Sequence, residues 1–74
     1  MTKTPEQATR RLAHRSLLAF LDEDKDLPWV LGEIKTSGVR GPRLQEVFDS
    51  LKDYPKPDRL QEAYAACKAR AWVD

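Results

Sequence analysis

The residues best suited to bind a ligand lie around a predicted turn between Lys35 and Arg43. Gly38 and Gly41 can adopt backbone angles that other residues avoid, and Pro42 favours the first turn of a following helix. Unpaired amides at the start of a helix, together with the helix dipole, attract an anion. The segment is therefore interpreted either as a phosphate-binding corner or as an ordinary tight connector between two helices.

Basic side chains extend this corner into a predicted nucleic-acid-binding set. The set has five cations: Arg11, Arg15, Lys35, Arg40 and Arg43. Arg11 and Arg15 share one face of a predicted first helix because they are four residues apart. If this helix packs near the turn, the five side chains converge on one surface and contact phosphates without reading the base sequence. In the alternative interpretation, Arg43 pairs with Glu46 along its own helix and Arg40 is simply solvated.

Catalytic and metal-binding chemistry has little support in the sequence. His14 is the single histidine, so neither a histidine-based metal cluster nor a Cys-His-Asp set can be assembled, and we interpret it as a half-buried structural residue. The acidic run at residues 22–26 lacks the ligand spacing, the glycine and the distal glutamate of a calcium loop. The sequence therefore predicts a non-enzymatic protein with no metal, no cofactor and no evident small-molecule substrate.

A second candidate surface combines the acidic run with tryptophan. Its predicted partner-binding residues are Asp22, Asp24, Trp29 and Trp72. Trp29 falls outside the apolar stripe that includes Val30 and Ile34, and tryptophan is enriched at the energetic centres of protein interfaces. In the alternative interpretation, Trp29 covers an edge of the core and the acidic run is the solvated end of a helix.

The composition indicates a small globular protein. A chain of 74 residues makes one domain and buries about 60% of its unfolded surface. Hydrophobic residues at 41% and charged residues at 34% are typical of a folded helical domain. The net charge of +1 argues against a protein that coats a polyanion, although the charges are unevenly spread. A single cysteine excludes an internal disulfide, and no run approaches the roughly 20 apolar residues of a membrane helix, so a cytoplasmic protein without a membrane partner is predicted.

Prolines predict where the helices that position these residues begin. Four of the five prolines stand just before an amphipathic pattern: Pro5, Pro28, Pro42 and Pro57. The predicted helices cover approximately residues 5–23, 28–36, 42–53 and 57–71. Thr4 and Gln7 form a predicted capping box at the first of them. The expected fold class is all-α, a small single-domain bundle over residues 1–74 in which residues 1–4 and 73–74 are frayed.

Apolar residues at helical spacing predict the core faces of these helices. The predicted faces contain Ala13, Leu17, Phe20, Leu21, Leu27, Val30, Leu31, Ile34, Leu44, Val47, Phe48, Leu51, Leu60, Ala63, Tyr64, Cys67 and Ala71. Cys67 is expected to be a buried, reduced thiol. Trp72 and Val73 are positioned to clip the C-terminal end onto the fold.

The sequence from Val30 to Leu51, which contains the run Ser37-Gly-Val-Arg-Gly-Pro-Arg, resembles a helix-hairpin-helix or helix-two-turns-helix element. The most similar version is that of the actinobacterial integration host factors, which are small DNA-binding nucleoid proteins. The resemblance implies that turn amides and a basic side chain hold the phosphates of one DNA strand. The implied residues are Gly38, Val39, Arg40, Gly41 and Arg43. The glycines stand one residue further apart here than in the usual Gly-x-Gly hairpin.

Two functions follow as hypotheses from these features. The first is a small DNA-binding protein that contacts duplex phosphates through the 38–43 glycine turn and the basic first helix. A helix-turn-helix that places residues 42–53 in the major groove is a variant of it, although Glu46, Asp49 and Asp53 make that helix acidic. The second is a protein-interaction module, such as a small accessory or phage-type protein that docks on a larger complex.

Overall fold

The computed structural model describes the backbone of residues 5–73 and the side chains of residues 8–73, and this part contains helices joined by turns, with no strand. The four helices are α1 (Pro5–Asp22), α2 (Leu27–Ser37), α3 (Pro42–Ser50) and α4 (Pro57–Ala69). The predicted all-α fold of four helices is confirmed. The predicted Thr4 cap, with its Gln7 partner, lies outside the described side chains.

Local sequence explains where α2 begins and ends. The Asp26 side chain caps its start by accepting a hydrogen bond from the Trp29 amide at 3.2 Å. Gly38 ends the helix in the left-handed conformation, with φ of 75°, and its amide donates to the carbonyls of Ile34 and Lys35. The acidic run therefore supplies a helix cap as well as solvated charge.

Two helices, α3 and α4, end two or more residues earlier than predicted. Residues 51–53 do not continue α3, because the Leu51 amide turns back to the Phe48 carbonyl and the Leu51 side chain is buried. At the end of α4, Ala71 adopts φ of 62°, the Ala71 amide bonds the Lys68 carbonyl, and the Trp72 amide bonds the Cys67 carbonyl at 2.9 Å. This is the hydrogen-bond pattern of a Schellman motif, which normally has glycine at the left-handed position. Because alanine occupies this position instead of glycine, the sequence gives no signal for the end of the helix.

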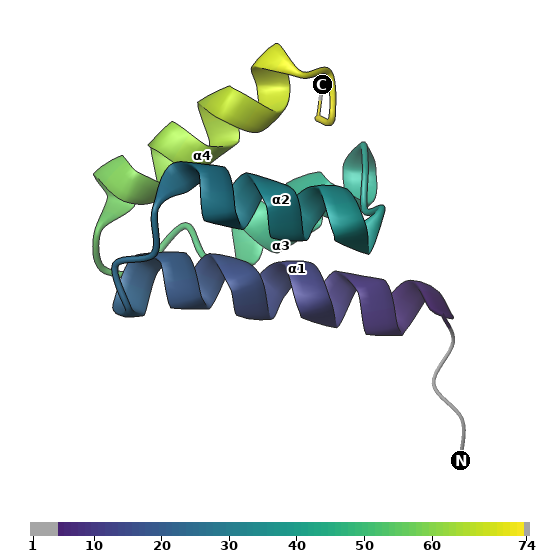
Figure 1. The fold of residues 1–74 in the computed structure, drawn as a ribbon, viewed down its shortest axis with the longest axis horizontal. Coiled ribbons are helices and arrows are strands. Elements are labelled where there is room, and N and C mark those ends of the chain that lie inside the picture. The colour runs from purple at the N-terminus through teal and green to yellow at the C-terminus, as the bar shows by residue number, and fades with distance from the viewer. Residues whose placement is uncertain (1–4, 74) are drawn as a thin grey trace.

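The helices are arranged around the antiparallel pair α1 and α2 (Figure 1). The N-terminal half of α1 and the C-terminal end of α2 consequently lie at the same end of the molecule. α1 packs most extensively on α2 and also contacts α3, whereas α4 packs mainly on α2. The α2–α3 turn and the chain segment after α4 lie at this same end.

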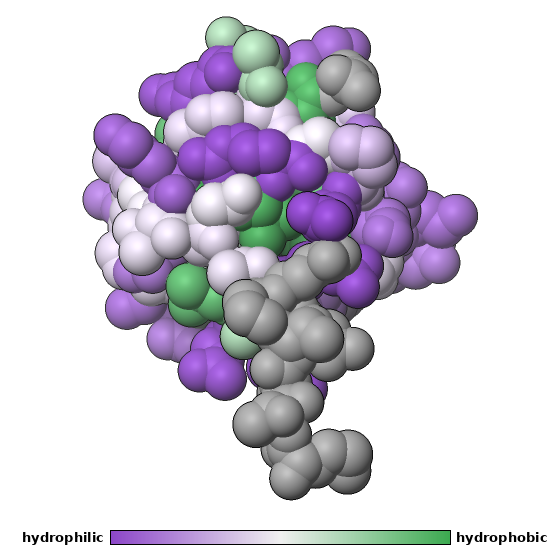
Figure 2. Space-filling view, turned by 90° about the vertical axis from the view of Figure 1, so that its right-hand side faces the viewer, coloured by the Kyte–Doolittle hydropathy of each residue, from purple (hydrophilic) through white to green (hydrophobic). Residues whose placement is uncertain are grey.

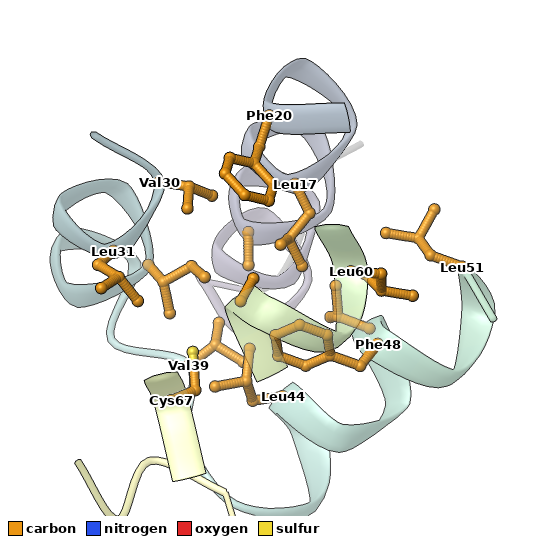
Figure 3. Packing of buried hydrophobic residues seen from close by; sticks show 14 of the residues in the cluster. Leu17, Phe20, Val30, Leu31, Val39, Leu44, Phe48, Leu51, Leu60 and Cys67 are labelled. Atoms are coloured by element: carbon orange, nitrogen blue, oxygen red, sulfur yellow. The ribbon is translucent and has the colours of Figure 1, made fainter. Parts of the chain in front are cut away.

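The interior of the bundle is one hydrophobic cluster to which all four helices contribute (Figure 3). Leu17, Phe20, Ile34 and Leu44 are fully buried, as their helical spacing predicts. Val73 is only 3% exposed and belongs to the cluster, so the prediction that this residue frays is wrong. Residues 1–4 and 74 lie outside the described part of the chain.

The end of the α3–α4 loop and the first turn of α4 close the C-terminal end of α1. The Arg59 guanidinium lies 4.1 Å from the centroid of the Phe20 ring and donates to the carbonyls of Phe20 and Lys25. Lys56 Nζ donates to the Leu21 carbonyl at 2.7 Å. Because the last carbonyls of a helix lack partners within it, these cations both complete their hydrogen bonds and complement the helix dipole.

The glycines of α2 provide a matched pair of stability tests. A methyl group at Gly32 or Gly38 meets no atom within 4 Å, so the backbone alone decides the effect of each substitution. Gly32→Ala is expected to raise the free energy of unfolding by about 0.5–1 kcal/mol, since alanine favours a helix interior. Gly38→Ala is expected to lower it by about 1–2 kcal/mol, because φ of 75° is strained for alanine. Urea denaturation followed by circular dichroism measures the free energy of unfolding of both variants. Equal effects of the same sign would contradict the opposite backbone requirements of Gly32 and Gly38.

Candidate nucleic-acid interface

The amides of the glycine turn are occupied by hydrogen bonds within the protein. The Gly38 amide donates to Ile34 and Lys35, and the Val39 amide donates to Ser37 Oγ at 3.2 Å. The Gly41 amide donates to the Trp72 carbonyl at 2.7 Å. The expectation that these three amides hold phosphates is therefore wrong for this conformation.

Val39 and Arg40 also have structural roles that the sequence did not indicate. Val39 is 3% exposed and packs in the hydrophobic cluster, so its predicted contact with nucleic acid is wrong. The half-buried Arg40 guanidinium donates to the carbonyls of Ile34 and Val39, at 3.2 and 2.7 Å. It also lies 4.4 Å from the centroid of the Trp72 ring. Arg40 thus closes the C-terminal end of α2 and holds the C-terminal segment, rather than being simply solvated.

Trp72 connects the end of α4 to the α2–α3 turn. Its carbonyl accepts the Gly41 amide, and its half-buried ring lies near both Arg40 and Arg70, whose guanidinium is 5.8 Å from the ring centroid. The next residue, Val73, anchors the segment in the core. The predicted clip of Trp72 and Val73 onto the fold is confirmed, and it brings the end of α4, with Arg70, to the glycine turn.

Two acid-free stretches of the chain meet at this place. Residues 34–45, between Glu33 and Glu46, carry three cations, and residues 63–73, between Glu62 and Asp74, carry two. Together they contribute +5 without an acidic residue, against +1 for the whole chain. We call this surface the basic end and define it by Lys35, Arg40, Arg43, Lys68 and Arg70.

The side chains of the basic end are mostly accessible. Lys35, Arg43, Lys68 and Arg70 are exposed, and Arg40 is half-buried. Figure 2 shows this end of the molecule, where hydrophilic residues lie above and to the right of a small hydrophobic area. Lys68 and Arg70 were missed by the sequence analysis. The acid-free stretch that contains them can be read from the sequence. Its position beside the glycine turn depends on the Gly41–Trp72 hydrogen bond, which the sequence does not show.

Arg11 and Arg15 are exposed but belong to another face of the molecule. Ala13, Leu17 and Phe20 form the buried face of α1. At 100° per residue, Arg11 and Arg15 point to the opposite side of the helix. The predicted convergence of five cations therefore does not occur. Arg10, instead, faces α3 and pairs with Glu46 at 3.1 Å.

The residues of the second candidate surface are divided between two places. Trp72 belongs to the basic end, whereas Trp29 is half-buried beside α1, with Lys25 Nζ 5.5 Å from its ring centroid. Asp22 accepts hydrogen bonds from the Tyr54 hydroxyl at 2.6 Å, and this bond is the main cause of a raised pKa of Tyr54. Asp24 lies 3.6 Å from Lys56 Nζ.

Cys67 lies beneath the C-terminal segment, in the fully buried part of the core. Burial raises the pKa of its thiol to about 11, against the opposing effect of Arg70 and Arg40. Since the thiolate is the nucleophilic form, this environment is unsuited to covalent catalysis. Over residues 5–73, no three His, Cys, Asp or Glu side chains gather in a way that could hold a metal ion. None of the helices in that range has the length and apolar character required to cross a membrane.

Comparison with known proteins leaves the chain without a recognised relative. No family model, no curated protein and no solved structure matches it. The function proposed below therefore rests on the arrangement of the chain's own residues.

Proposed function

We propose that this protein binds DNA without catalysing a reaction, and that it contacts the phosphates of a duplex through the basic end. The observation that carries the proposal is the meeting of two acid-free stretches with a combined charge of +5. Phosphates attract such a surface whatever the base sequence, because binding releases the counterions condensed on the duplex.

The low net charge of the chain does not oppose this function. Apart from Glu33, which lies within α2, the acidic residues nearest to this helix stand in the loop before it, at the end opposite the glycine turn (Figure 1). Eleven residues of helix separate the two ends by about 16 Å. This separation exceeds the Debye length of about 10 Å at 0.1 M salt, so the acidic loop is largely screened from a phosphate bound at the basic end.

Contact is made by side chains in this proposal, and not by the turn amides. The four exposed cations supply the phosphate contacts, while Arg40 and Trp72 hold the two stretches together. The helix-turn-helix variant is disfavoured because Leu44 and Val47, which would face the bases, are buried.

Backbone amide shifts of labelled protein, titrated with a short mixed-sequence duplex, test this function. Four phosphate contacts predict a loss of affinity of roughly 100-fold between about 50 and 200 mM salt. The shifts are expected at residues 35–43 and 68–72. An absence of shifts at low salt would refute DNA binding, and shifts centred on Arg11 and Arg15 would place it on the other face.

A further inference from the structure

The side of the molecule formed by α1 and α2 carries an open groove that the proposed function does not use. Its floor is largely apolar and includes Leu12, Ala19 and the half-buried Trp29. Ser16 also lines the groove, but its hydroxyl donates to the Leu12 carbonyl at 2.8 Å. Because the Ser16 hydroxyl already has a hydrogen-bond partner, it needs none from a ligand, and the floor is suited to apolar side chains.

The rim of the groove is predominantly acidic. Asp22, Glu23 and Glu33 line it, against Arg15 and Lys25. The adjoining loop adds Asp24 and Asp26, and Lys56 lies beside Asp24, so five acids and three cations give a local charge of −2. Asp22, Asp24 and Asp26 already have partners within the protein. Glu23 and Glu33 have none among the described residues, so they are available to an incoming cation.

We propose that this groove binds a cationic amphipathic helix of a partner protein. A groove between two packed helices accepts the apolar face of a third helix, as in other helix-in-groove complexes. The acidic rim selects lysine and arginine at the edges of that face, because complementary charge favours the right partner and repels acidic ones. We call this surface the acidic groove.

Trp29 provides the anchor of the acidic groove. Tryptophan is enriched among residues that dominate binding energy, and this ring is already close to one cation, Lys25, at 5.5 Å. That distance is near the outer limit of about 6 Å for a cation–π contact, so an arginine of the partner can replace Lys25 at closer range.

The acidic groove is independent of nucleic-acid binding. It lies along α1 and α2, whereas the basic end lies where α2 stops and the segment after α4 returns. Peptide binding at the acidic groove can therefore be tested separately from DNA binding at the basic end. If both hold, one molecule bridges a duplex and a basic segment of another protein.

The test uses the full chain, labelled for amide shifts, and two synthetic helical peptides. The first peptide has leucine on one face and lysine on the other, and the second has glutamate in place of every lysine. The lysine peptide is expected to shift residues 12–23 and 29–33 and to bind at least tenfold more tightly than the glutamate peptide. Equal binding of the two peptides, or shifts centred on α3 and α4, would overturn the proposal.

Matched variants separate the groove from net charge. Glu23→Lys/Glu33→Lys and the control Asp53→Lys/Glu62→Lys each raise the net charge from +1 to +5, since each of the two reversals adds two charges. Only the first variant is expected to lose tenfold or more in affinity for the lysine peptide. Trp29→Ala, with its fold checked by circular dichroism, is expected to lose a similar factor. An equal loss of affinity in the control variant would contradict the proposal. Amide shifts at the groove that depend on protein concentration in the absence of peptide would also contradict it, because a second copy of the chain would then occupy the groove.

Discussion

The triple variant Lys35→Glu/Arg43→Glu/Lys68→Glu is expected to lose duplex binding, by at least about 100-fold at low salt. The three side chains are exposed and come from the two acid-free stretches that meet at the basic end. Each lost phosphate contact is expected to reduce the slope of log affinity against log salt by roughly 0.9. Fluorescence anisotropy of a labelled duplex at several salt concentrations measures both quantities.

The control for this variant is Arg11→Glu/Arg15→Glu/Lys52→Glu. Both triple variants change the net charge from +1 to −5, since each of the three reversals subtracts two charges. The control is expected to retain most of the affinity, because Arg11 and Arg15 lie on the face of α1 opposite its buried residues. If the two variants lose the same affinity, binding depends on total charge and the basic end is not the interface.

Phe20→Ala is expected to lower the free energy of unfolding by about 3–5 kcal/mol. The Phe20 side chain is fully buried, and its ring also supports the Arg59 guanidinium that closes the end of α1. A domain of this length has roughly 4–11 kcal/mol of total stability, at 0.05–0.15 kcal/mol per residue. The variant is therefore expected to lose a large share of the total stability, which urea denaturation followed by circular dichroism will measure.

Phe20→Leu is the matched comparison, with an expected loss of about 1 kcal/mol, because leucine refills most of the space with apolar atoms. The difference between the two variants measures the contribution of a filled core. A loss below about 1 kcal/mol in Phe20→Ala would mean that the ring is not packed as described.

The role of Arg40 illustrates why the site could be predicted only in part. Its charge and its position between two glycines indicated a phosphate ligand, and the same features suit a residue that closes a helix. The structure shows its guanidinium on the carbonyls of Ile34 and Val39 and near the Trp72 ring. Which acceptors surround a cation depends on how distant segments pack, and this information is not local in the sequence.

The helices and most of the core could be predicted from the sequence. Pro28, Pro42 and Pro57 stand at or next to the first residue of α2, α3 and α4, and apolar residues three and four apart form the buried faces. Gly38 ends α2 because it adopts the left-handed angles without a side-chain clash. These features depend on interactions among residues within one or two helical turns, so the local sequence contains them.

The composition of the site depends on the tertiary structure. An all-α chain, in which residues 34–45 and 63–73 carry cations and no acids, follows from the sequence alone. Only packing joined these stretches, through the Gly41–Trp72 hydrogen bond and the burial of Val73, and it placed Arg11 and Arg15 on another face. The same contacts occupied the turn amides and buried Val39. The physical reason is that helix formation is governed by near neighbours, whereas a buried amide takes whichever carbonyl the folded chain brings to it.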